Sequence, residues 1–175
     1  MRKLIVLRGV PGTGKSTWAT KYFEKRKTKC PYEDVIILNR DSYRMMRVKY
    51  SEDEYQKSFR DDMWDKSIRK GFWEYFAKAI RKCDVVILDT TMCHFADYVA
   101  LQWHIFEYVN ETNTMLKVRW HIFVEEHGST HGVPGKIMND YWDQFNDTLD
   151  YVGEPKYVVI DGRVVELDEK WCYEN

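Results

Sequence analysis

The sequence Gly9-Val10-Pro11-Gly12-Thr13-Gly14-Lys15-Ser16, with Thr17 directly after it, decides the fold of this chain. It matches the phosphate-loop pattern of Gly, four residues and Gly-Lys-Ser/Thr at every required position. The apolar run at residues 4–7 predicts a buried strand before the loop, and apolar side chains at helical spacing over residues 18–23 predict a helix after it. A loop in this context turns its backbone N–H groups inward and binds phosphate at the helix N-terminus.

This loop, from Gly9 to Thr17, is therefore the expected binding site for the phosphates of ATP. Lys15 is expected to reach the β- and γ-phosphates and to act in catalysis, and the Ser16 hydroxyl is expected to ligate Mg²⁺. The alternative is a Gly-rich turn that binds nothing. The complete pattern and both flanking elements favour the phosphate loop.

The composition is that of one globular domain. The 175 residues are 44% hydrophobic, which supports a folded core in a single domain spanning residues 1–175. No apolar run is long enough for a membrane span, and the four apolar residues after Arg2-Lys3 are too few for a signal peptide. The four cysteines show no Cys-x-x-Cys spacing, so we expect reduced thiols in a cytoplasmic protein.

Charge is unevenly distributed along the chain. Residues 1–82 hold 21 Lys and Arg against 11 Asp and Glu. Residues 83–175 hold the other 6 Lys and Arg against 17 Asp and Glu. This asymmetry indicates a polyanionic partner on the basic side, unless the charges of the two halves pair within one fold.

Further along the chain, apolar strands alternate with helices. A Ser-x-x-Glu capping box at residue 51 begins a helical stretch that is expected to reach residue 82, as one bent helix or as two divided near Gly71. The Asp161-Gly162 pair is typical of a hairpin turn. Strands are expected at residues 35–38, 85–88, 116–124, 157–160 and 163–167, and further helices at 95–110 and 134–149. This order predicts an α/β fold with a mostly parallel sheet closed by an antiparallel C-terminal hairpin.

Two aspartates follow strands that should end beside the phosphate loop, where such sheets bind their ligands. Asp41 follows the second strand, and its carboxylate could accept the proton of an attacking hydroxyl; the alternative is a simple helix cap. Arg44, three residues later, would share its helix face and could hold an acceptor phosphate. Asp89 follows the third strand and could bind the water shell of the metal or orient the acceptor, or merely cap a turn before Thr90.

Three segments, at residues 9–19, 39–44 and 88–91, together resemble the kinase domain of bacteriophage-type 5′-polynucleotide kinases over roughly the first 110 residues. The resemblance implies transfer of the γ-phosphate of ATP to a hydroxyl of DNA or RNA, most obviously a 5′-OH end. It implies Asp41 as general base, and Arg44, Asp89 and Thr90 as acceptor-binding residues.

The same resemblance implies an adenylate-kinase-like P-loop kinase fold. That fold is a three-layer sandwich with a mostly parallel five-stranded sheet, and a short lid would lie at about residues 125–135. If a phage encodes the chain, the resemblance places it in the host cytoplasm.

The chain also departs from this family. The stretch at residues 125–134 contains no Arg. The charge of the transition state would then be met by Lys15, Mg²⁺, His127, His131 or Lys136, or by an arginine from elsewhere such as Arg119. Thr91 stands where the family has Asn. The chain has seven Trp residues, and aromatic side chains near Tyr43, Tyr50 or Trp64 could stack on an acceptor base.

Other functions remain open from the sequence. The same groups could phosphorylate the 5-hydroxymethyl group of hydroxymethyluracil in phage DNA, or a small molecule such as a nucleoside or antibiotic. Outside the enzymes, a nucleotide-binding switch would use the loop without an acceptor base.

Overall fold

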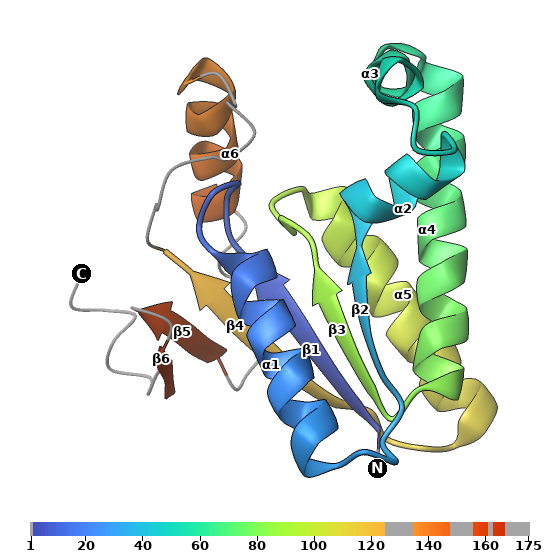
Figure 1. Ribbon diagram of the computed structural model, residues 1–175, viewed down its shortest axis with the longest axis vertical. Coiled ribbons are helices and arrows are strands. Elements are labelled where there is room, and N and C mark those ends of the chain that lie inside the picture. The colour runs from blue at the N-terminus through green and yellow to red at the C-terminus, as the bar shows by residue number, and fades with distance from the viewer. Residues whose placement is uncertain (1, 125–134, 148–155, 161–162, 167–175) are drawn as a thin grey trace.

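Six strands form one sheet in the order β2-β3-β1-β4-β5-β6 (Figure 1). The structure is a computed structural model that describes residues 2–124, 135–147, 156–160 and 163–166. The strands are β1 (Lys3–Arg8), β2 (Val35–Asn39), β3 (Val85–Asp89), β4 (Lys117–Phe123), β5 (Lys156–Ile160) and β6 (Arg163–Glu166). Five of them run parallel and β6 pairs antiparallel with β5, so the predicted fold class and C-terminal hairpin are confirmed, with six strands where five were expected.

Helices cover both faces of this sheet, as the three-layer prediction requires (Figure 1). Trp18, Tyr22 and Phe23 of α1 pack against Ile5 and the other buried side chains of one face. Helices α4, α5 and α6 contribute to the larger core cluster on the other face. The helices are α1 (Lys15–Lys29), α2 (Arg40–Arg47), α3 (Glu52–Arg60), α4 (Asp62–Lys82), α5 (Phe95–Thr112) and α6 (Gly135–Asp147). None of the helices in the described ranges is long and apolar enough to cross a membrane.

The helical stretch after residue 51 divides at Asp61, so the predicted division near Gly71 is wrong. Asp61 is an N-cap whose side chain accepts a hydrogen bond from the backbone N–H of Trp64, which starts α4. Gly71 lies inside α4, where a Cβ atom would come within 2.5 Å of the Tyr43 hydroxyl. The glycine is thus explained by a close contact between helices and does not interrupt the helix.

Arg8, the last residue of β1, ties the sheet to α6. Its side chain is 1% exposed, its guanidinium donates to the carbonyl oxygen of Phe145 at 2.6 Å, and it lies 4.7 Å from the centre of the Phe145 ring. Burial lowers the pKa of Arg8, against the opposing charge of Cys93. The contact anchors α6 on the residue that immediately precedes the phosphate loop.

His121 of β4 is expected to make the stability of the protein depend on pH under mildly acidic conditions. Burial, together with the charge of Arg119, lowers the pKa of His121 from 6.5 to about 4. The folded chain keeps the imidazole neutral while the unfolded chain protonates it. The free energy of unfolding should therefore be unaffected by this group above pH 6.5 and fall by up to about 3 kcal/mol as the pH drops towards 4.

Urea unfolding at a series of pH values tests this prediction. The His121→Gln variant removes the titrating group while keeping a polar side chain, and its stability should fall less steeply over the same interval. If the free energy of unfolding fell equally steeply with pH in the two proteins, His121 would not contribute to the pH dependence.

Candidate active site

The phosphate loop adopts a conformation that its glycines make possible. Gly12 and Gly14 have φ values of 84° and 81°, in the left-handed region that favours glycine. At Gly9 the reason is space, because a Cβ atom would lie 2.7 Å from the carbonyl oxygen of Phe123 and 2.8 Å from the Thr13 hydroxyl. The chain therefore forms the loop that the sequence pattern predicts, and α1 begins at Lys15 directly after it.

Lys15 is folded back onto this loop. Its side chain is 7% exposed, and Nζ donates a hydrogen bond to the carbonyl oxygen of Val10 at 2.7 Å. Burial lowers the pKa of Lys15, while the charges of Asp89, Cys93 and Asp41 oppose that shift. Both predicted aspartates thus lie within electrostatic reach of the loop lysine, and the structure brings the ends of β1, β2 and β3 together around it.

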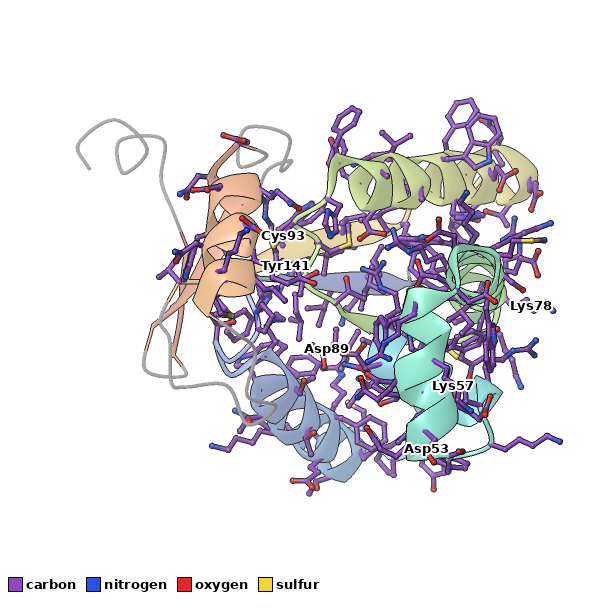
Figure 2. The ribbon with its side chains drawn as sticks, turned by 90° about the horizontal axis from the view of Figure 1, so that it is seen from above. Asp53, Lys57, Lys78, Asp89, Cys93 and Tyr141 are labelled. Carbon is purple, nitrogen blue, oxygen red and sulfur yellow. The ribbon has the colours of Figure 1, made fainter. Side chains whose placement is uncertain are left out.

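Asp89 ends β3, which lies between β2 and β1, and Thr90 follows it directly. Asp89 is 2% exposed, and its carboxylate accepts a hydrogen bond from Asn39 Nδ2 at 3.0 Å. Figure 2, which looks down on the sheet from above, shows Asp89 near the middle of the molecule between α1 and α3. The Thr90 hydroxyl is buried and has no hydrogen-bond partner among the residues that the structure describes. A ligand or water hydroxyl is the usual partner of such a group.

Asp41 lies exposed in the first turn of α2, and it does not cap that helix. Asn39 is the cap, because its side-chain oxygen accepts a hydrogen bond from the backbone N–H of Ser42 at 2.9 Å. The Tyr55 side chain lies near Asp41, and burial followed by the charge of Asp41 raises the pKa of Tyr55 to about 12. Tyr55 therefore stays protonated at neutral pH beside this carboxylate. The sequence gives no signal that α3 folds back onto Asp41.

Arg44 points away from the loop, into the corner between α3 and α4. It is 3% exposed, and its guanidinium donates to the carbonyl and hydroxyl oxygens of Ser58 at 3.2 and 3.0 Å and to Asp65. It also lies 3.9 Å from the centre of the Phe59 ring. Burial would raise the pKa of Asp65, but the hydrogen bond from Arg44 and the charge of Arg69 lower it overall. In this structure Arg44 holds α3 and α4 together, and its role in holding an acceptor phosphate stays a prediction.

An ion pair that sequence reasoning missed fixes the start of α2. Arg40 donates two hydrogen bonds to the carboxylate of Asp97 in the first turn of α5, at 3.0 and 2.7 Å. The Asp97 side chain is 4% exposed. Because Arg40 is the neighbour of Asp41, this pair holds the turn that carries the exposed carboxylate. The two residues are 57 positions apart, and no local pattern links them.

A phosphate loop usually binds its nucleotide together with Mg²⁺, and only a few ligands of this ion would come from the protein. The described part of the chain has no cluster of three or more His, Cys, Asp or Glu side chains that could hold a metal ion alone. Mg²⁺ bound together with a nucleotide needs no such cluster, because phosphates and waters supply most of its ligands. The exposed Ser16 hydroxyl and the Asp89 carboxylate fit this requirement.

Comparison with known proteins finds one family and several similar folds. The profile of the family described as AAA domain, AAA_33, matches residues 4–109, more than half of the chain. No curated protein sequence matches the chain significantly. A solved structure of the PezAT chromosomal toxin-antitoxin system of Streptococcus pneumoniae has a TM-score of 0.59 and 16% identity, covering 100% of this chain and 72% of that one.

Two solved structures of the Pnkp1/Rnl/Hen1 complex, one described as an RNA repair complex, are also similar. Their TM-scores are 0.48 and 0.56, with 22% and 17% identity over 71% and 94% of this chain. This chain covers only 36% and 48% of the chains it matches there. The second of these structures, with a TM-score of 0.56 and 17% identity, shows a shared fold and no more.

Proposed function

Because the chain belongs to the AAA domain family AAA_33 and carries a P-loop kinase-like domain, we propose that it transfers the γ-phosphate of ATP to a hydroxyl group of DNA or RNA. The observation that carries this proposal is the placement of Asp41. Its carboxylate is exposed, lies near Tyr55 and is within electrostatic reach of Lys15 in the phosphate loop. A kinase needs a general base for the acceptor hydroxyl, whereas a nucleotide switch does not.

The proposed reaction needs a base on one side of the γ-phosphate and positive charge on the other. The acceptor hydroxyl would give its proton to Asp41 while its oxygen bonds to the γ-phosphorus. The bond between that phosphorus and the β–γ bridging oxygen would break, which leaves ADP. Lys15 would turn from the Val10 carbonyl towards the phosphates and stabilise their charge. Mg²⁺, when bound, would neutralise further phosphate charge.

Two neighbouring residues would orient the acceptor. Asp89 is fixed by Asn39, and the buried Thr90 hydroxyl offers a hydrogen bond that no described residue uses. For Arg44 to grip an acceptor phosphate, it would have to leave Asp65 and Ser58. The contact with an acceptor phosphate is therefore proposed for a conformation in which α3 has moved.

Incubation with γ-labelled ATP and three acceptors tests the proposal. The acceptors are a 5′-hydroxyl oligonucleotide, a 5′-phosphorylated duplex that contains hydroxymethyluracil, and a nucleoside. We expect label in the first. Label in the second alone would assign the base hydroxymethyl group as acceptor. Label in the nucleoside alone would assign a small-molecule kinase, and label in none of the three would contradict the proposal.

A further inference from the structure

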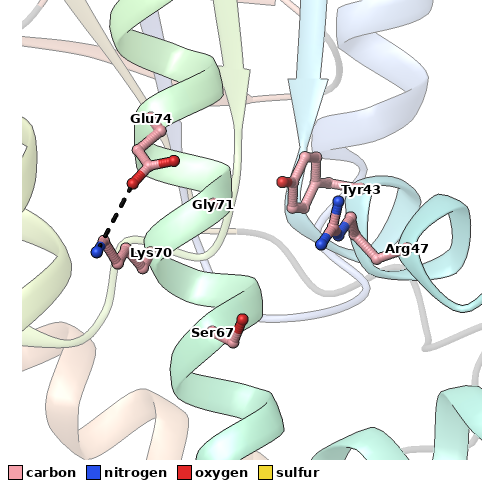
Figure 3. A pocket seen from close by; sticks show the side chains of 6 residues that line it. All are labelled: Tyr43, Arg47, Ser67, Lys70, Gly71 and Glu74. Carbon is pink, nitrogen blue, oxygen red and sulfur yellow. Dashed lines mark ion pairs between the residues drawn. The ribbon is translucent and has the colours of Figure 1, made fainter.

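A groove runs between α2 and α4, outside the candidate active site. One part of it, of about 280 Å³, is lined by Tyr43 and Arg47 from α2 and by Ser67, Lys70, Gly71 and Glu74 from α4 (Figure 3). Arg47 stands on one side and Lys70 on the other, both exposed to solvent. Lys70 and the only acid of this lining, Glu74, are 4.0 Å apart with side chains 81% and 59% exposed, so their mutual attraction is weak.

A second hollow, of about 230 Å³, adjoins the first at Tyr43. It begins beside Asn39 and Ser42, which flank the turn that carries Asp41, and Met46, Tyr50 and Tyr75 contribute to its walls. The Tyr43 and Tyr75 rings stack at a centroid distance of 5.9 Å, and Tyr75 is 41% exposed. The groove thus combines cationic sides with exposed aromatic rings, and it starts next to the proposed catalytic carboxylate.

At the C-terminal end of α2 the backbone adopts a conformation that residues other than glycine rarely take, and the Tyr50 ring there is exposed to solvent. Lys49 and Tyr50 have φ values of 52° and 61°, in the left-handed region where helix ends normally carry Gly or Asn. Tyr50 is nevertheless a large aromatic side chain and is 74% exposed. Strain of this kind in an exposed residue commonly accompanies a functional contact.

We propose that this groove binds single-stranded nucleic acid, with Tyr50 and Tyr75 stacking on bases while Arg47 and Lys70 contact phosphates. Such pairing of rings and cations is the chemistry by which proteins hold a flexible polyanion. The basic excess of residues 1–82, which include α2 and α4, agrees with that partner. The inference rests on the proposed function in one respect: the bound strand would be the continuation of the acceptor beyond its reacting end.

Fluorescence anisotropy with a fluorescein-labelled twelve-nucleotide thymidine oligonucleotide tests the groove directly and needs no catalysis. The double variant Arg47→Glu with Lys70→Glu should weaken binding at least tenfold. Its matched control is Lys25→Glu with Lys29→Glu on α1, which reverses two exposed charges elsewhere and should bind as the unaltered protein does. Equal affinity of the groove variant and its control, or no binding by the unaltered protein, would overturn the inference.

A second variant separates binding from folding. Tyr50→Asn removes the ring and places a residue that tolerates the left-handed conformation, so the melting temperature should not fall. Binding of the oligonucleotide should still weaken several-fold. Unchanged binding would exclude the stacking role.

Kinase assays then distinguish the two proposals. If ATP labels the twelve-nucleotide acceptor with the same KM in the double variant and the unaltered protein, the groove is excluded and the proposed function stands. If no acceptor is labelled but the charge reversal still abolishes binding, the groove stands and the proposed function fails.

Discussion

Replacing Asp41 with Asn is expected to lower the rate of phosphate transfer by about 10² to 10⁴-fold, the usual contribution of a general base. The amide keeps the shape of the side chain and can still contact Tyr55, but it cannot accept the proton of the acceptor hydroxyl. Because Asp41 is exposed and does not cap α2, the fold and the affinity for ATP should be retained. Single-turnover transfer of label, measured beside ATP binding by calorimetry, provides the two readouts.

Asp53→Asn is the matched control, since it makes the same change at an exposed position on α3. It should transfer phosphate at the normal rate. If Asp41→Asn kept normal transfer, Asp41 would not be the base. If it lost ATP binding along with transfer, its role would be in nucleotide binding.

Lys15→Met should separate activity from stability. The substitution removes the only loop side chain proposed to meet the β- and γ-phosphates, and we expect transfer to fall at least about a hundredfold. The melting temperature should not fall, because burial disfavours the charged amine and Met fills a similar volume. The Val10 carbonyl keeps a donor, since the Thr13 hydroxyl also binds it at 2.9 Å.

Lys21→Met on the exposed side of α1 is the control for this experiment. It makes the same Lys-to-Met replacement at a position where no phosphate is expected to bind, and it should leave the rate of phosphate transfer unchanged. A clear loss of stability in Lys15→Met would show that Lys15 contributes to the fold of the empty loop. Normal transfer by that variant would contradict the assigned phosphate site.

The parts of the structure that could be predicted from the sequence are those set by local pattern. Short apolar runs locate β1, β2 and β3, because strands buried on both faces of a parallel sheet are predominantly apolar. The Gly-Lys-Ser sequence locates the loop, and the rule that ligands bind at the carboxyl ends of parallel strands brings Asp41 and Asp89 to it. The predicted lid at residues 125–135 lies almost wholly outside the described residues, so its role stays a prediction.

What could not be predicted depends on contacts between distant residues. Spacing places Arg44 near Asp41 on the helix, but the direction of its long side chain is decided by Asp65 and Ser58, which lie 21 and 14 positions away. Gly71 resembles a helix break in sequence and is instead needed for the approach of Tyr43. These partners lie on other helices, so local spacing in the sequence cannot identify them.

The contact between Arg8 and Phe145 has a thermodynamic consequence. Arg8 joins the backbone directly before Gly9 to α6, so a displacement of α6 would be transmitted to the loop that is expected to hold the triphosphate. Coupling of this kind is reciprocal. A nucleotide that orders the loop would in turn favour the position of α6 in which Phe145 contacts Arg8.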